Sequence, residues 1–233
     1  MLNRTLEIES PKARFGAKRR VQIDAILEAP AAELVGECLT REVSWEYVYR
    51  RRGEVVTVPE QALAAMTPAE RARVADEVLQ GASAGFQFNY WKFSMVDAYR
   101  KGQIPSALRA LLESLASAET IAMVREITGC ADIRRVDAQA TMYRPGNFLT
   151  AHTDQQHGEH HRRAAYVIQL SRDWQADWGG LLHFFDAQGA VLDTFVPGFN
   201  RMSLFAVPQP HAVSMVTPFA GSVRYAITGW FTA

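Results

Sequence analysis

The chain has few cysteines, no excess of charge of either sign and no long apolar run, and each shortage excludes a class of protein. Cys38 and Cys130 are too few and too unpatterned for a disulfide scaffold or a zinc knuckle, so we expect reduced, buried thiols. Twenty-five basic residues balance 25 acidic ones, which gives no net field toward nucleic acid or an anionic membrane. No stretch reaches the roughly 18 apolar residues of a membrane span, and the first residues lack a signal-peptide pattern. We therefore expect a cytoplasmic protein without nucleic-acid or membrane partners. The oligomeric state stays open.

The length and composition favour one domain with a substantial core, because 233 residues include 48% hydrophobic ones. We divide it into a basic tail (1–20), a helix-rich supporting region (21–130) and a β-rich core (131–233). Several Lys and Arg residues and a proline fall within residues 10–20, so we expect a solvated, partly disordered arm, with a binding device as the alternative.

Helical patterns dominate before residue 130. They cover Ala31–Val43, Pro68–Gln80 and a long stretch from Pro105 to Thr128. Thr67 and Glu70 have the spacing of a capping box, which fixes the start of the second helix. Between the first two helices, Trp45–Arg50 and Glu54–Pro59 are predicted to form a strand pair that turns at Arg52-Gly53.

Short strand-like runs follow, separated by turns rich in Gly and Pro. They are Ile133–Tyr143, Phe148–Asp154, Ala164–Leu170, Leu181–Phe185, Val191–Val196, Met202–Val207, His211–Thr217 and Val223–Phe231. Such spacing is typical of a sandwich, and eight strands suit a jelly roll. We predict a mostly β fold with helical support (α+β): a jelly roll, or double-stranded β-helix, in the C-terminal half, with helices from the N-terminal half packed on it.

His152-Thr153-Asp154 and the distant His211 contain the side chains that an iron(II) oxygenase site needs. Two imidazoles and one carboxylate on one face of a metal leave the opposite face open, which is the facial-triad arrangement. On a strand, His152 and Asp154 would project together while Thr153 turns away. An isolated H-x-D motif means little, since it also fits a surface hydrogen bond, so the case depends on its surroundings.

Arg224 begins the last predicted strand, where alternation puts it on one face with Ala226, Thr228 and Trp230. If that face lines the interior, the guanidinium is buried, and a buried charge needs a partner. Its planar fork matches a carboxylate, so a dicarboxylate ligand would satisfy it. The alternatives are an exposed strand arginine or an internal pair with an aspartate such as Asp193 or Asp186.

Residues 140–233 resemble the prolyl-hydroxylase-like branch of the Fe(II)- and 2-oxoglutarate-dependent dioxygenases. Residues 143–154, 178–182, 211–213 and 224–231 carry the resemblance, in matching order and spacing. It implies that His152, Asp154 and His211 bind iron. It also implies that Arg224 holds the distal carboxylate of 2-oxoglutarate and that Tyr143 hydrogen-bonds this co-substrate.

The resemblance further implies that O2 and 2-oxoglutarate are consumed, that succinate and CO2 are released, and that an unactivated C–H bond is hydroxylated, with ascorbate in a supporting role. The carboxylate of Asp154 favours hydroxylation over halogenation. The expected substrate is a prolyl or other residue in a protein, with a free amino acid or small metabolite as the alternative. Two rivals are a cupin-like isomerase or hydrolase, which would not need Arg224, and a metal-binding sensor module without turnover.

The remaining histidines and an aromatic segment have two interpretations each. We interpret His157–Arg163 as a polar loop beside the active-site mouth, with a metal-binding tract as the alternative. His183 is expected to be a hydrogen-bonded structural residue. The aromatic residues of Gly85–Ser94 fit either a substrate-side lip or core packing; they are Phe86, Phe88, Tyr90, Trp91 and Phe93.

Overall fold

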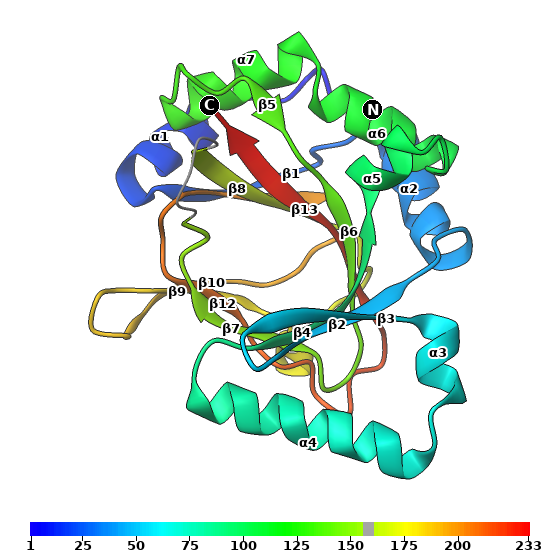
Figure 1. Cartoon of the computed structure of the whole chain (residues 1–233). Coiled ribbons are helices and arrows are strands. Elements are labelled where there is room, and N and C mark those ends of the chain that lie inside the picture. Colours follow the sequence, from blue (N-terminus) through cyan, green and yellow to red (C-terminus); the bar gives the residue numbers. More distant parts are fainter. Residues whose placement is uncertain (156–160) are drawn as a thin grey trace.

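The computed structural model describes residues 1–155 and 161–233, and its centre is a twisted antiparallel sheet that curls into a nearly closed barrel (Figure 1). The helices are α1 Glu9–Lys18, α2 Ala29–Arg41, α3 Glu60–Ala65, α4 Pro68–Ala84, α5 Met95–Arg100, α6 Ser106–Leu115 and α7 Ala118–Thr128. The strands are β1 Arg20–Asp24, β2 Glu46–Arg51, β3 Glu54–Pro59, β4 Phe88–Ser94, β5 Arg135–Val136, β6 Gln139–Tyr143, β7 Phe148–His152, β8 Arg162–Gln169, β9 Leu182–Phe185, β10 Val191–Phe195, β11 Arg201–Ala206, β12 His211–Val213 and β13 Arg224–Thr232.

The strands follow the order β1-β11-β8-β13-β6-β4-β7-β12-β9-β10, with β2 and β3 extending from β4 and β5 pairing with β13. In Figure 1, β1, β8 and β13 lie in one layer and β7, β12, β9 and β10 in the facing layer. The two ends of the path meet through an ion pair, because Arg20 Nε of β1 lies 3.2 Å from Asp193 Oδ2 of β10. The barrel is therefore closed by a buried arginine at its seam.

Strand β13 separates two hydrophobic cores, which explains its near-continuous burial. Ile227 and Phe231 belong to the outer core, between the sheet and the helices α1, α2, α6 and α7 that cover it (Figure 1). Ala226 belongs to the inner core within the barrel, and Arg224 faces the same interior. Each fully buried Leu, Ile or Phe side chain contributes about 1.5–3 kcal/mol to folding, so both faces of β13 hold the layers together.

The N-terminal helices and hairpin lie close to their predicted ranges. The capping box of α4 is present: the Thr67 amide donates to Glu70 Oε2 at 2.7 Å, and the Glu70 amide donates to Thr67 Oγ1 at 3.3 Å. The predicted stretch from Pro105 to Thr128 contains two helices, α6 and α7. They separate where Ser117 accepts a hydrogen bond from the Thr120 amide and caps α7. Strands β2 and β3 pair as predicted.

The prediction of a solvated, partly disordered basic arm is wrong. The segment contains α1, in which Pro11 and Phe15 are buried, followed by β1, which pairs with β11. Pro11 and Phe15 are four residues apart, so they share one helical face, while the basic residues between them face solvent. The prediction relied on the basic composition of the segment and overlooked the amphipathic pattern of α1.

The structure bears on the expectations about the cysteines and about membrane spans. Cys38 is buried and Cys130 is partly buried, and both are free. Among the described residues, no helix has both the length and the apolarity that crossing a bilayer requires.

Candidate metal centre and cavity

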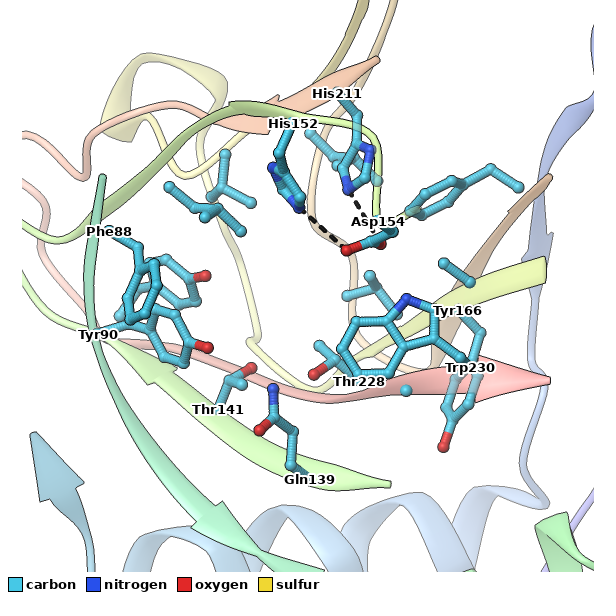
Figure 2. Close-up of a pocket in the computed structure, with 18 of the residues that line it drawn as sticks. Phe88, Tyr90, Gln139, Thr141, His152, Asp154, Tyr166, His211, Thr228 and Trp230 are labelled. Carbon is cyan, nitrogen blue, oxygen red and sulfur yellow. Dashed lines mark ion pairs between the residues drawn. The ribbon is translucent and has the colours of Figure 1, made fainter. Parts of the chain in front are cut away.

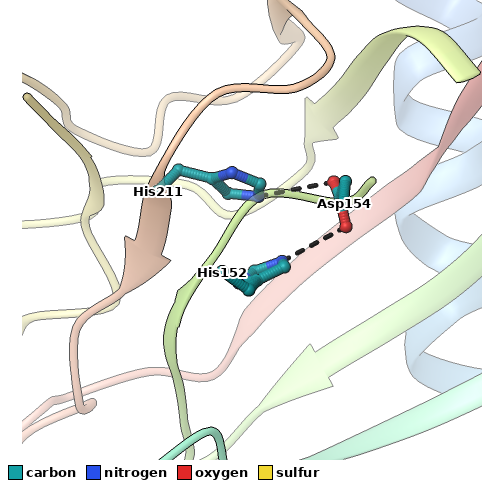
Figure 3. A group of neighbouring side chains, drawn as sticks. All are labelled: His152, Asp154 and His211. Carbon is teal, nitrogen blue, oxygen red and sulfur yellow. Dashed lines mark ion pairs between the residues drawn. The ribbon is translucent and has the colours of Figure 1, made fainter. Parts of the chain in front are cut away.

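His152, Asp154 and His211 converge at one end of the barrel (Figure 3). His152 ends β7 and His211 begins β12, and the two are direct cross-strand partners. His152 Nε2 lies 3.2 Å from Asp154 Oδ1, and His211 Nε2 lies 3.4 Å from Asp154 Oδ2. All three candidate ligand atoms lie within 4.8 Å of one another, which is compact enough for a single ion. The predicted grouping of these side chains is present.

Backbone carbonyl groups orient both imidazole rings. His152 Nδ1 lies 3.0 Å from the Thr150 carbonyl oxygen, and His211 Nδ1 lies 2.8 Å from the Gln209 carbonyl oxygen. A carbonyl oxygen only accepts, so Nδ1 must carry the proton in both rings. The Nε2 lone pairs are then free and directed at Asp154, which is the tautomer that metal binding at Nε2 requires.

The protonation states also suit a metal centre. Burial, together with the neighbouring His152, lowers the pKa of His211 to about 4. Burial alone would raise the pKa of Asp154, but the hydrogen bond and the charges that the protonated forms of His152 and His211 would supply outweigh burial and lower the pKa to about 2. At neutral pH the site therefore presents a neutral His211 and an ionised Asp154, the forms that bind metal.

Asp154 reaches the site differently from the predicted strand geometry. Strand β7 ends at His152, and Asp154 has φ 59°, in the left-handed region. The i, i+2 alternation along an extended strand is therefore wrong for this residue. A local backbone reversal turns its carboxylate toward the histidines. Non-glycine residues adopt this conformation at a cost of about 1–2 kcal/mol, so surrounding contacts must hold it.

A cavity of about 180 Å³ extends from the triad into the barrel (Figure 2). Arg224 lies at its inner end with 1% of its surface exposed, and its Nε has no hydrogen-bond partner among the described residues. The proposed internal pairs do not form. Asp193 binds Arg20, and Asp186 accepts hydrogen bonds from the Gln188 and Ala190 amides. Within the described ranges, Arg224 is a buried cation with no carboxylate within ion-pair distance.

Tyr143 lies beside Arg224 in the same cavity. The Arg224 guanidinium is 5.0 Å from the centre of the Tyr143 ring, and Tyr90 stacks on that ring at 5.2 Å. Burial raises the pKa of the Tyr143 phenol far above its usual range, so the hydroxyl keeps its proton. It can therefore donate a hydrogen bond to an anionic ligand at this end of the cavity.

The aromatic segment divides between the cavity and the core. Phe86, Phe88 and Tyr90 line the cavity, and the Phe86 ring lies 5.4 Å from the His152 ring. Trp91 packs away from it, against Tyr47 and beneath the Arg144 guanidinium. Alternation along β4 separates the two groups.

Arg162 is a cavity residue that the sequence interpretation assigned to a loop. It is the first residue of β8 and is half-buried, with its guanidinium 3.4 Å from the centre of the Trp230 ring. Residues 156–160 of the predicted loop His157–Arg163 lie outside the described residues. Strand alternation does not reveal this position, because Ala164 and Ile168, which share its parity, lie in the outer core. A register shift between β13 and β8 at Phe231/Thr232 changes the alternation at Arg162. His183 matches its prediction, since Nδ1 lies 2.8 Å from Thr194 Oγ1.

Comparisons with known proteins agree with this geometry. Residues 138–232 match the family model of the 2OG-Fe(II) oxygenase superfamily, in agreement with the resemblance seen over residues 140–233. The chain is 27% identical over 150 residues to mouse prolyl 3-hydroxylase OGFOD1, a match that covers 60% of this chain and 26% of that protein. The chain thus spans about a quarter of this curated relative.

Solved structures show the same fold. A prolyl-4-hydroxylase from Pseudomonas putida matches with TM-score 0.60 and 18% identity, over 97% of this chain and 98% of that one. A prolyl hydroxylase from Trichoplax adhaerens, solved with a hypoxia inducible factor peptide fragment, matches with TM-score 0.61 and 17% identity, over 95% and 86%. The predicted double-stranded β-helix with supporting helices is confirmed.

Proposed function

We propose that this chain is an Fe(II)- and 2-oxoglutarate-dependent dioxygenase that hydroxylates an unactivated C–H bond in a prolyl residue of a polypeptide. The observation that carries the proposal is the combination, in one cavity, of the two-histidine, one-carboxylate cluster and the unpaired Arg224. The cluster alone would also suit a metal-dependent hydrolase, and a buried arginine alone could serve the fold. Together they fit a metal and a dicarboxylate bound side by side.

His152, Asp154 and His211 would hold Fe(II), a set of nitrogen and oxygen ligands that suits non-haem iron. Arg224 would bind the distal carboxylate of 2-oxoglutarate, with the Tyr143 hydroxyl as a second donor. When bound, Fe(II) and 2-oxoglutarate supply the O2-dependent oxidation of a C–H bond, with release of succinate and CO2. The protein orients these groups and excludes water through the buried Phe184, Phe205 and Val213.

The substrate assignment rests on two observations. The relatives described above are prolyl hydroxylases by name, and the cavity lining includes the aromatic rings of Phe86, Phe88, Tyr90 and Trp230, which suit a compact apolar ring. A free amino acid or small metabolite is the alternative. We treat residues 1–233 as one catalytic domain, and its two free thiols support a cytoplasmic location.

The test is turnover on peptides with an inactive matched variant. The protein is incubated with Fe(II), 2-oxoglutarate, ascorbate and a tryptic digest of a cell lysate under ¹⁸O2. We expect succinate release and ¹⁸O incorporation at proline, both absent in Asp154→Ala. Hydroxylation only of free amino acids or metabolites would favour the alternative substrate. Metal and 2-oxoglutarate binding without succinate would favour the sensor module, and succinate equal to that of Asp154→Ala would contradict the dioxygenase.

A further inference from the structure

Beside the metal centre, the Arg162 guanidinium at the start of β8 feels the charges of two carboxylates, Asp154 and Asp137. Arg162 Nη1 donates to the Asp154 carbonyl oxygen at 3.2 Å and lies 3.7 Å from Asp154 Oδ1. On its other side, Asp137 is close enough for the Arg162 charge to lower the pKa of Asp137, although burial has the larger, opposite effect. Arg162 thus contacts a metal-site carboxylate and is under the electrostatic influence of a second, half-buried one.

Asp154 needs support that the sheet does not supply. It lies beyond the end of β7, and its φ of 59° is unfavourable for a residue with a side chain. After Gln155, the next residue that the structure describes is His161, which directly precedes Arg162, the first residue of β8. The hydrogen bond from Arg162 to the Asp154 carbonyl therefore ties the two sides of this connection together, directly at the strained residue.

Arg162 is itself held by a rigid assembly. Its guanidinium stacks over the Trp230 ring at 3.4 Å. The Trp230 amide donates to Asp137 Oδ1 at 2.8 Å, and the Asp137 amide donates back to the Trp230 carbonyl at 3.1 Å. Tyr166 Oη donates to the Asp137 carbonyl at 2.8 Å. At Gly229 even a Cβ would collide with that carbonyl, so this close approach requires glycine.

We propose that Arg162, braced by Trp230 and Asp137, is a positioning residue that holds the Asp154 carboxylate toward the two histidines. The proposal rests on the proposed function, in which Asp154 is a metal ligand. Arg162 touches no atom of the histidines that would bind metal. It acts through the backbone and carboxylate of Asp154.

The neighbouring Arg163 provides a matched control. It also forms an ion pair with an aspartate, Asp132, at 2.5–2.9 Å, and it belongs to the same strand. That pair is exposed and away from the cavity. Replacing Arg162 or Arg163 therefore removes the same chemical group from adjacent positions, and only one of them faces the metal centre.

The test measures metal binding by the whole chain, independently of turnover. Co(II) is titrated into wild type, Arg162→Met, Arg162→Lys and Arg163→Met, and its visible absorption reports the coordination. We expect Arg162→Met to weaken Co(II) binding about 10–100-fold, the usual effect of losing a group that orients a metal ligand, and to alter the spectrum. Arg162→Lys should recover part of the affinity, and Arg163→Met should stay within twofold of wild type.

Equal Co(II) affinity and identical spectra for Arg162→Met and wild type would overturn the positioning role while leaving the metal site intact. A wild-type protein that bound no Co(II) would instead contradict the proposed function. If Arg162→Met does not fold, Asp137→Asn and Arg162→Lys carry the test. Asp137→Asn keeps an acceptor for the Trp230 amide but removes the charge facing Arg162, so a several-fold loss of Co(II) affinity is expected, and none would contradict the proposal.

Discussion

Two arginines occupy opposite ends of the same cavity, and their partners differ completely. Arg224, at the inner end, is fully buried and has no carboxylate within ion-pair distance among the described residues. Arg162, at the metal end, contacts Asp154, stacks on Trp230 and feels the charge of Asp137. Burial lowers the pKa of both guanidinium groups, but only for Arg162 do carboxylates counteract this effect.

This difference fits the two proposed roles, in which Arg224 binds a ligand and Arg162 positions Asp154. An uncompensated buried charge costs several kcal/mol, so the fold keeps Arg224 only at an energetic loss that a bound dicarboxylate would offset. Arg162 is already compensated and needs no ligand. Under the proposed function, an arginine would therefore bind the ligand at one end of the cavity and hold Asp154 in place at the other.

The largest expected effect is at the metal end. Asp154→Ala removes one of three candidate ligands, so it should abolish turnover and weaken Fe(II) binding more than loss of an outer group does, which is about 10–100-fold. Succinate release and iron titration measure the two effects. Asp132→Ala, at the exposed pair with Arg163, is the control and should behave as wild type. Turnover that survives Asp154→Ala would remove Asp154 from the iron site.

At the inner end, Arg224→Met should raise the KM for 2-oxoglutarate tenfold or more, since a charge-assisted hydrogen bond contributes about 1.5–3 kcal/mol. Metal loading should be unchanged. Without ligand, Arg224→Met should be as stable as wild type or more stable, because an unpaired buried charge is lost. Arg162→Met, in contrast, should unfold at a lower temperature than wild type, because it loses the contacts between Arg162 and Asp154. Co-substrate affinity within twofold of wild type would make Arg224 structural.

A third expectation concerns the stability of the metal-free protein in acid. The pKa of His211 falls from 6.5 in the unfolded chain to about 4 in the fold, so the unfolded chain binds the proton more readily. The stabilisation is complete above pH 6.5 and is lost as pH falls to about 4, by roughly 3 kcal/mol. Urea unfolding across this range should show a smaller pH slope for His211→Gln. His161→Gln, at an exposed position, should keep the wild-type slope.

The smallest effect is expected at the entrance. Phe86→Ala removes an aromatic side chain that is 41% exposed and lies beside His152. A substrate ring packed against Phe86 would lose an aromatic contact of about 0.5–1.5 kcal/mol. Peptide hydroxylation should fall several-fold while succinate release without peptide stays unchanged. Phe219→Ala, at an exposed position outside the cavity lining, is the matched control. Equal loss of both activities would place Phe86 in the metal site instead.

Sequence reasoning succeeded where a local pattern determines structure. Alternation along β13 placed Arg224, Thr228 and Trp230 on the cavity face, and the spacing of Thr67 and Glu70 fixed the start of α4. It failed where long-range contacts decide. The seam between Arg20 and Asp193 joins residues 173 positions apart, and no local pattern in a basic segment indicates it.

The same limit applies within the site. The left-handed backbone of Asp154 departs from the strand alternation by which it was identified, so its grouping with the histidines was predicted from a geometry that it does not adopt. Arg162 was missed because its role depends on Asp137 and Trp230, which are distant in sequence. Which groups lie beside a buried charge is visible only in the folded structure, because these groups come from distant parts of the sequence.

The central claim is that the two ends of this cavity hold Fe(II) and 2-oxoglutarate together, and an anaerobic titration tests it most directly. Iron-loaded protein is titrated with 2-oxoglutarate while the visible absorption is recorded, for wild type and Arg224→Met. We predict a metal-to-ligand charge-transfer band that saturates in wild type and needs at least tenfold more 2-oxoglutarate in Arg224→Met. Fully iron-loaded wild-type protein that develops no new band would contradict the claim.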